Sequence, residues 1–122
     1  MEKAFMNYLK LMEEGALVQV IETYFDENII QIENTGASMQ GKEVLLNHEK
    51  KNLSRVNSVE IKIPNYAINE EKGIALGEMI IHFEPKQGSK KRLEEAFLQK
   101  WKNGKITYQK FYFKEILDAT PL

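Results

Sequence analysis

Three side chains in this sequence are of types that could move protons: Glu33, Tyr8 and His48. A carboxylate that faces apolar residues has a raised pKa and acts well as a general base. An imidazole accepts or gives a proton near neutral pH, and a buried tyrosine keeps its hydroxyl for a hydrogen-bond partner. Each also has a structural interpretation, Glu33 as a solvated strand-end carboxylate, and Tyr8 and His48 as hydrogen-bonded core residues. They form the candidate catalytic set.

The elements that must position these residues can be predicted from hydrophobic periodicity. Helices are predicted over residues 5–12, 16–24 and 41–53, and a strand over 27–33. Gly15 follows the first helix at a position where glycine commonly ends helices. The third helix would place His48 on a core-facing side with Val44 and Leu45.

From Val56 onward the pattern changes to the period of two that is typical of half-buried strands. Strands are predicted from residue 56 onward and over 74–83, 92–101 and 105–116. The Asn103-Gly104 pair predicts a tight hairpin between the last two. Helices followed by a four-strand antiparallel meander predict an α+β fold, and no linker or repeat divides the chain.

Five short segments, in this order, resemble the nuclear transport factor 2-like superfamily and, within it, the SnoaL-like and ketosteroid isomerase-like branch. They are Glu13–Leu17, Tyr24–Ile29, Gly41–Glu43, Trp101–Ile106 and Lys110–Phe113, and they extend over nearly the whole chain. The resemblance implies one SnoaL-like domain over residues 1–122. Its fold would be a cystatin-like cone, with N-terminal helices packed in a curved antiparallel sheet around a pocket. Function does not follow from this fold, which isomerases, cyclases, dehydratases and transport adaptors share.

The resemblance also implies roles for individual residues. Tyr8 matches the position of the family's oxyanion-binding tyrosine, and Glu33 matches its general-base aspartate. The family's third group, a protonated acid, falls on Phe97, or on Gln99 if the alignment shifts by two residues. Because neither side chain is a carboxylic acid, steroid isomerase activity is not implied.

The family pattern turns alternate residues of the last three strands toward the pocket. The expected ligand-binding residues are Met79, Ile81, Phe97, Gln99, Trp101, Gln109, Phe111 and Phe113. A lining of aromatic and aliphatic side chains with a few polar groups is typical of a site for a small apolar molecule.

The opposite face of the sheet is expected to carry an apolar patch. Ile106, Tyr108 and Tyr112 would point outward there, and Glu78 and His82 would form a solvated or interface pair on the same side. An exposed apolar patch commonly marks an interface. Since relatives usually dimerise through this surface, the resemblance implies a homodimer.

Composition excludes several classes of function. The chain has 122 residues, a formal net charge of −1, two histidines and no cysteine, which rules out disulfides, thiolate zinc sites and a cysteine nucleophile. It has neither the basic balance of a nucleic-acid-binding protein nor an apolar run long enough to span a membrane. No phosphate-binding glycine loop or paired-histidine motif predicts a nucleotide or metal cofactor. The N-terminal residues do not read as a signal peptide, so the expected location is the cytoplasm.

Two functions remain open. The first is a cofactor-independent isomerase, cyclase or dehydratase that transfers protons on a small apolar carbonyl compound. Glu33 or His48 would be the base and Tyr8 the oxyanion donor, and Gln99 or Gln109 would orient the substrate. The second is a non-catalytic ligand-binding or dimeric adaptor domain, which the missing third acid favours.

Overall fold

A computed structural model describes the backbone of residues 1–118 and the side chains of residues 1–112. Its helices are α1 (Glu2–Glu13), α2 (Leu17–Tyr24) and α3 (Lys42–Leu53). Its strands are β1 (Phe25–Ile32), β2 (Ser38–Gln40), β3 (Val56–Asn69), β4 (Ile74–Pro85), β5 (Lys91–Lys102) and β6 (Lys105–Asp118). The described strands form one sheet in the order β2-β1-β6-β5-β4-β3, and the predicted α+β architecture is confirmed.

The connections within the sheet follow the predicted meander and extend it. Strands β3 to β6 pair antiparallel in chain order, whereas β1 pairs in parallel with β6 and so brings the N-terminal half against the last strand. The short strand β2, which pairs with β1, was not predicted. Its length of three residues is too short to show a periodic pattern.

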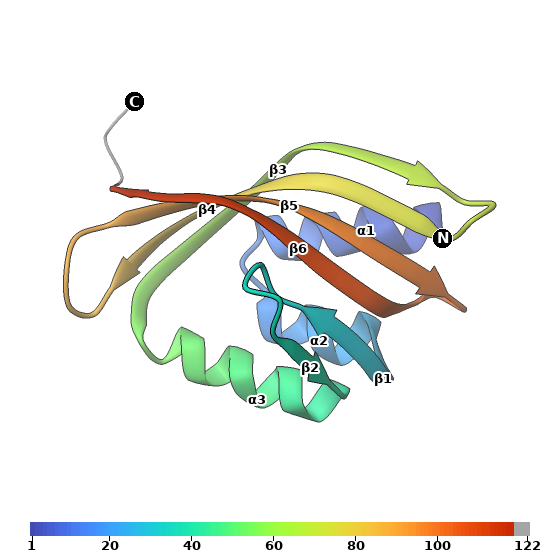
Figure 1. Cartoon of the computed structure of the whole chain (residues 1–122), viewed down its shortest axis with the longest axis horizontal. Helices are drawn as coiled ribbons and strands as arrows, with labels where there is room; N and C mark the ends of the chain where they lie inside the picture. The colour runs from blue at the N-terminus through green and yellow to red at the C-terminus, as the bar shows by residue number, and fades with distance from the viewer. Residues whose placement is uncertain (119–122) are drawn as a thin grey trace.

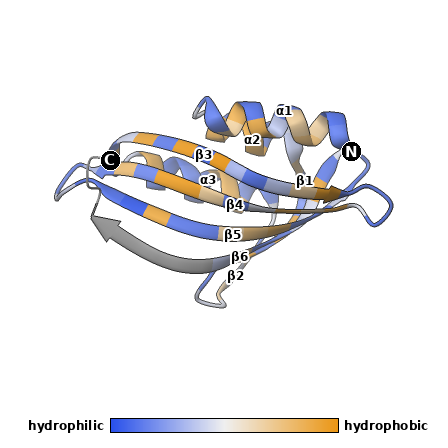
Figure 2. Ribbon diagram, turned by 90° about the horizontal axis from the view of Figure 1, so that it is seen from above, coloured by the Kyte–Doolittle hydropathy of each residue, from blue (hydrophilic) through white to orange (hydrophobic). Residues whose placement is uncertain are grey.

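The sheet curves around the three helices, which lie on its concave face (Figure 1). Hydrophobic residues recur along β3, β4 and the first two helices (Figure 2), and the buried ones among them belong to one core cluster. Burial of these facing stripes is the main source of stability, at about 25 cal/mol per Å² of apolar surface. No helix in residues 1–118 is long and apolar enough to cross a membrane.

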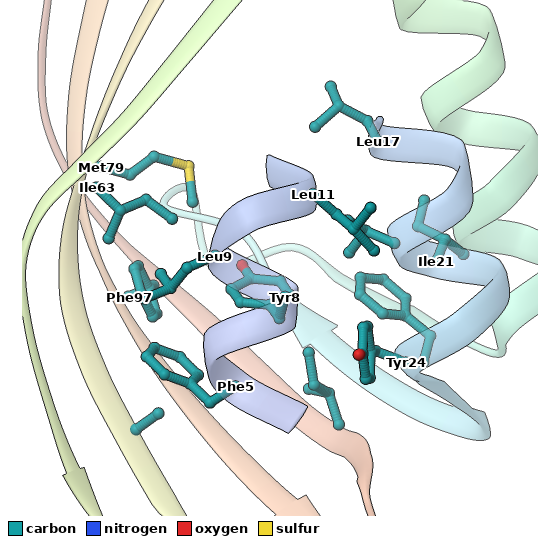
Figure 3. Packing of buried hydrophobic residues seen from close by; sticks show 14 of the residues in the cluster. Phe5, Tyr8, Leu9, Leu11, Leu17, Ile21, Tyr24, Ile63, Met79 and Phe97 are labelled. Atoms are coloured by element: carbon teal, nitrogen blue, oxygen red, sulfur yellow. The ribbon is translucent and has the colours of Figure 1, made fainter. Parts of the chain in front are cut away.

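An aromatic cluster packs the first two helices against the sheet. The ring of Trp101 on β5 contacts the rings of Phe5, Tyr8 and Tyr24, with centroids 5.7 to 6.0 Å apart. Figure 3 shows Phe5 and Tyr8 projecting from α1, with Phe97 facing them from the sheet. Two of these contacts are edge-on, the arrangement that ring quadrupoles favour. The cluster fixes α1, and with it Tyr8, against the sheet.

Gly77 on β4 makes room for one of these rings. The ring of Phe97, its cross-strand partner on β5, lies over the glycine. A Cβ atom at this position would meet Cζ of Phe97 at 2.5 Å, well inside van der Waals contact. Phe97 is therefore locked into the core between the sheet and α1, with only 1% of its surface exposed.

A bulge in β6 changes the expected alternation of its side chains. Lys100 pairs with Tyr108 but the next residue, Trp101, pairs with Ile106, so Thr107 is an extra residue in β6. Ile106, predicted to point outward, is instead fully buried. That prediction is wrong because simple alternation from Gln109 does not account for the extra residue.

Candidate functional site

A cavity of about 540 Å³ lies between the concave face of the sheet and the helices. Its volume is in the range of small-molecule sites. Its apolar lining includes Met12, Leu17, Val20, Ile21, Phe25, Leu45, Leu53, Val56, Val59, Ile61, Met79, Ile81, Phe83, Leu93 and Phe111. Its polar lining is Tyr8, Gln31, Glu33, Asn34, His48, Glu49, Asn52, Arg55, Glu95 and Gln109. The site thus combines a mostly apolar wall with several groups that can exchange protons.

Most of the residues predicted for the site do meet around this cavity. Tyr8, Glu33, His48, Met79, Ile81, Gln109 and Phe111 all line it. Tyr8 lies on α1 and Glu33 directly follows β1, so the fold brings residues from separate elements to one cavity. The side chain of Phe113 lies outside the described residues.

Three predicted lining residues, Phe97, Gln99 and Trp101, lie in the core instead of the cavity wall. Helix α1 fills the part of the cone in front of them, where Phe5 and Tyr8 cover the sheet (Figure 3). Their inward orientation was predicted from strand alternation. Alternation does not reveal how deeply a helix fills the cone, so it could not separate core from cavity.

Tyr8 places a buried hydroxyl group at the cavity. Its side chain is 2% exposed, and burial raises the pKa of the hydroxyl well above its usual value. The Gln99 side chain opposes this pKa rise, and the negative charge of Glu95 adds to it. The hydroxyl therefore keeps its proton at physiological pH, which suits a donor to an oxyanion and not a base.

His48 is more exposed than predicted. Helix α3 turns Leu45 into the core, with 3% exposed, whereas Val44 is 50% exposed. His48 shares this outer side and lies at the rim of the cavity, with Nε2 3.2 Å from the Asn52 side-chain nitrogen. The buried side of α3 therefore includes Leu45 but not Val44 or His48, which were predicted to share it. The helix presents Glu49 to the cavity more fully than it presents His48.

Two half-buried carboxyl groups face the cavity without having been assigned a role from the sequence. Burial, reinforced by the negative charge of Glu33, raises the pKa of Glu95 on β5 to about 7. Burial also raises the pKa of Glu49, against the opposing effect of His48. Glu95 could have been found, since it precedes Phe97 by two residues on the inward face of β5.

Three buried glutamines connect the core to Glu33. The indole Nε1 of Trp101 donates to Gln99 at 3.0 Å, and Gln99 donates to Gln109 at 2.7 Å. Gln109 donates to Gln31 at 2.9 Å, and Gln31 donates to Oε1 of Glu33 at 3.0 Å. Each of these amides is at least nine-tenths buried, and leaving one unpartnered would cost about 1–3 kcal/mol. Gln99 and Gln109, predicted to orient a substrate, bind each other, and of the two only Gln109 lines the cavity.

The sheet register places the three amides side by side. Gln99 on β5 is the direct cross-strand partner of Gln109 on β6, which pairs with Gln31 on β1. Trp101 lies two residues further along β5 and so on the same face as Gln99, and Glu33 follows the end of β1, two residues after Gln31. Among the described side chains, those of residues 1–112, no group of three or more histidine, aspartate or glutamate residues is placed to hold a metal ion.

Comparison with known proteins identifies the fold. No protein-family model matches the sequence, and no curated protein matches it either. A protein of Mesorhizobium loti, provisionally named a SnoaL-like polyketide cyclase, superposes with a TM-score of 0.77 at 22% identity, covering 92% of this chain and 97% of that one. An LEH-like epoxide hydrolase of M. tuberculosis gives 0.74 at 13% identity, covering 92% and 80%. An NTF2-like protein of unknown function from Exiguobacterium gives 0.75 at 14% identity, covering 92% and 98%.

At these identities the likeness shows the fold. The chain has the nuclear transport factor 2-like cone, as do SnoaL-like proteins and a protein with a ketosteroid isomerase-like fold. The predicted resemblance in fold is confirmed.

Proposed function

We propose that this protein binds a small, largely apolar carbonyl compound and transfers protons on it without a cofactor, as an isomerase, cyclase or dehydratase. The observation that carries the proposal is the meeting of Glu33, Tyr8 and Glu95 around one mostly apolar cavity. They correspond to a base, a neutral hydroxyl donor and a carboxyl group whose pKa of about 7 leaves it partly protonated at neutral pH. Groups whose environments separate their protonation states in this way are suited to divide acid and base roles.

The proposed reaction begins with removal of a proton from the carbon next to the substrate carbonyl. Glu33 takes this proton as the C–H bond breaks, and the electron pair moves onto the carbonyl oxygen as an enolate. The hydroxyl of Tyr8 and the protonated form of Glu95 donate hydrogen bonds to that oxygen. Protonated Glu33 then returns the proton to a different carbon, which completes an isomerisation with no net gain or loss of atoms.

Structural relatives support an apolar small molecule as the ligand. Two of the similar structures carry names that refer to polyketide cyclisation and to epoxide hydrolysis, both reactions of small organic molecules. The cavity of this protein, at about 540 Å³, could hold such a compound.

The test is proton exchange on a panel of β,γ-unsaturated cyclic ketones of one to three rings. In deuterated buffer, the protein should convert at least one ketone to its conjugated isomer and change its deuterium content. Absorbance and mass spectrometry measure the two results. Binding without turnover across the panel would support the non-catalytic ligand-binding alternative and contradict the enzyme proposal.

We also propose that the protein is a homodimer through the uncovered face of the sheet. Leu76 and Tyr112 are 47% and 48% exposed there, an unusual exposure for large apolar side chains on a strand. Glu78 on β4 and Lys110 on β6 flank them with opposite charges. A patch with an apolar centre and both charges at its rim can pair with a copy of itself about a two-fold axis.

Replacing Leu76 and Tyr112 together by lysine should therefore give a monomer. Four like charges would face one another across the two-fold axis, and the apolar contact would be lost. Light scattering should report twice the mass of one chain for the wild type and the mass of one chain for the variant. Replacing Lys3 and Lys10, on the exposed side of α1, by glutamate is the control and should leave the dimer intact. A monomeric wild type would contradict the proposal.

A further inference from the structure

The glutamines between Trp101 and Glu33 can be arranged in only one direction. An indole N–H donates and never accepts, and a carboxylate only accepts. With these two groups at the ends, every amide between them must accept on the Trp101 side and donate on the Glu33 side. The observed hydrogen bonds follow this direction at all four links. The orientation of each amide is thus set by its neighbours.

The same arrangement constrains the carboxylate at its end. Gln31 holds Oε1 of Glu33 at 3.0 Å, and only this oxygen takes part in the chain of hydrogen bonds. The other oxygen, Oε2, stays available to a ligand, because Glu33 lines the cavity. Gln31 is itself held by Gln109, which is 4% exposed and cannot move without breaking two hydrogen bonds. A strand-end carboxylate with rotatable side-chain bonds thereby acquires a fixed position.

We propose that Gln31, Gln109 and Gln99 are positioning residues that aim Glu33 into the cavity and couple its charge to Trp101 in the core. The proposal deepens the proposed function, since Glu33 is the base in that reaction. Hydrogen-bonded amides polarise one another, so a negative charge on Glu33 strengthens every link behind it. Loss of that charge weakens the same links as far as the indole.

The coupling can be measured without a substrate. Trp101 is the one tryptophan of the chain, so its indole N–H gives a single resonance in ¹H–¹⁵N NMR spectra. In the wild type, this resonance should shift with pH at the same midpoint as the side-chain amide of Gln31. In Gln109→Met, the amide of Gln31 should still respond to pH while the indole of Trp101 no longer does at that midpoint. Persistence of the indole response in this variant would overturn the proposed coupling between Glu33 and Trp101, called the relay below.

Other charged and titratable groups around the cavity require controls. Glu49, Glu95, His48 and Arg55 also line it. Glu33→Gln should abolish the pH response that the Trp101 indole and the Gln31 amide share. Glu95→Gln should leave this response in place. The reverse pattern would assign the response to Glu95 and overturn the relay. Should Gln109→Met fail to fold, Gln31→Met removes the link nearest the surface and should likewise uncouple the indole.

Kinetics separate this inference from the proposed function. If a ketone of the panel is turned over, Gln109→Met should lower kcat by about ten- to a hundredfold, the effect of a misplaced catalytic group, with little change in KM. An unchanged kcat would contradict the positioning role. If no ketone is turned over, the NMR result still decides whether the relay exists, and the failure belongs to the proposed function alone.

Discussion

Replacing Glu33 by glutamine should lower turnover of a substrate ketone by about 10²- to 10⁴-fold, the range over which a positioned base contributes to rate. The amide retains the shape of the side chain and can still accept the N–H of Gln31 at its oxygen. It cannot take a proton from carbon. Because the cavity wall is otherwise unchanged, the binding constant of the ketone should change by no more than a few-fold, as isothermal calorimetry would measure.

The matched control for this variant is Glu60→Gln. Glu60 is an exposed strand carboxylate on β3 that does not line the cavity, so its loss should affect neither turnover nor binding. Equal turnover in Glu33→Gln and the wild type would remove Glu33 from the mechanism. A drop in binding that matches the drop in turnover would make Glu33 a ligand-binding residue instead of the base.

Replacing Glu95 by glutamine should stabilise the protein above neutral pH and hardly at all in mild acid. Burial and the charge of Glu33 raise the pKa of Glu95 to about 7 from an ordinary value of 4.5. The folded state therefore binds more protons than the unfolded state between these values, and the stability of the wild type falls as pH rises through this window. At pH 8 the full cost of the buried charge is present, and its removal should gain about 1–3 kcal/mol of unfolding free energy after allowance for partial exposure.

Urea unfolding of the two proteins at pH 5 and pH 8 measures this difference. The unfolding free energy of Glu95→Gln will still fall somewhat as the pH rises. The raised pKa of Glu49 has the same effect on stability and is present in both proteins. His48 at the rim and Glu33, Tyr8 and Arg55 around the cavity are present in both proteins. Glu60→Gln should have the wild-type pH dependence. If the difference in unfolding free energy between Glu95→Gln and the wild type is the same at both pH values, Glu95 is not a buried acid.

The fold itself could largely be predicted from local patterns. In β3 the apolar residues alternate, and in α1 and α2 they recur at helical spacing. This spacing shows directly in the sequence which side of each element is buried. The parallel pairing of β1 with β6 could not be predicted in this way. It joins residues far apart in the chain, Gln31 with Gln109, and no local pattern specifies which distant strand will be the partner.

The candidate site was predicted in part. Tyr8 and Glu33 were chosen by residue type and position, and both line the cavity. Glu95 precedes Phe97 by two residues on β5, but the sequence alone does not reveal a role for it, because a carboxyl group acquires an unusual pKa only from its surroundings. His48 was assigned to the core side of α3, whereas packing against α2 turned the helix so that Leu45 and Glu49 face inward.

The sequence by itself therefore determined an α+β domain and the residue types available for proton transfer, because side-chain chemistry and local periodicity are properties of the chain. The tertiary structure alone decided which of these groups act together. The depth to which α1 fills the cone assigned Phe97 and Trp101 to the core and left Glu95 at the cavity. Strand register aligned the glutamines behind Glu33. Protonation and orientation depend on neighbours distant in the chain, and only folding supplies those neighbours.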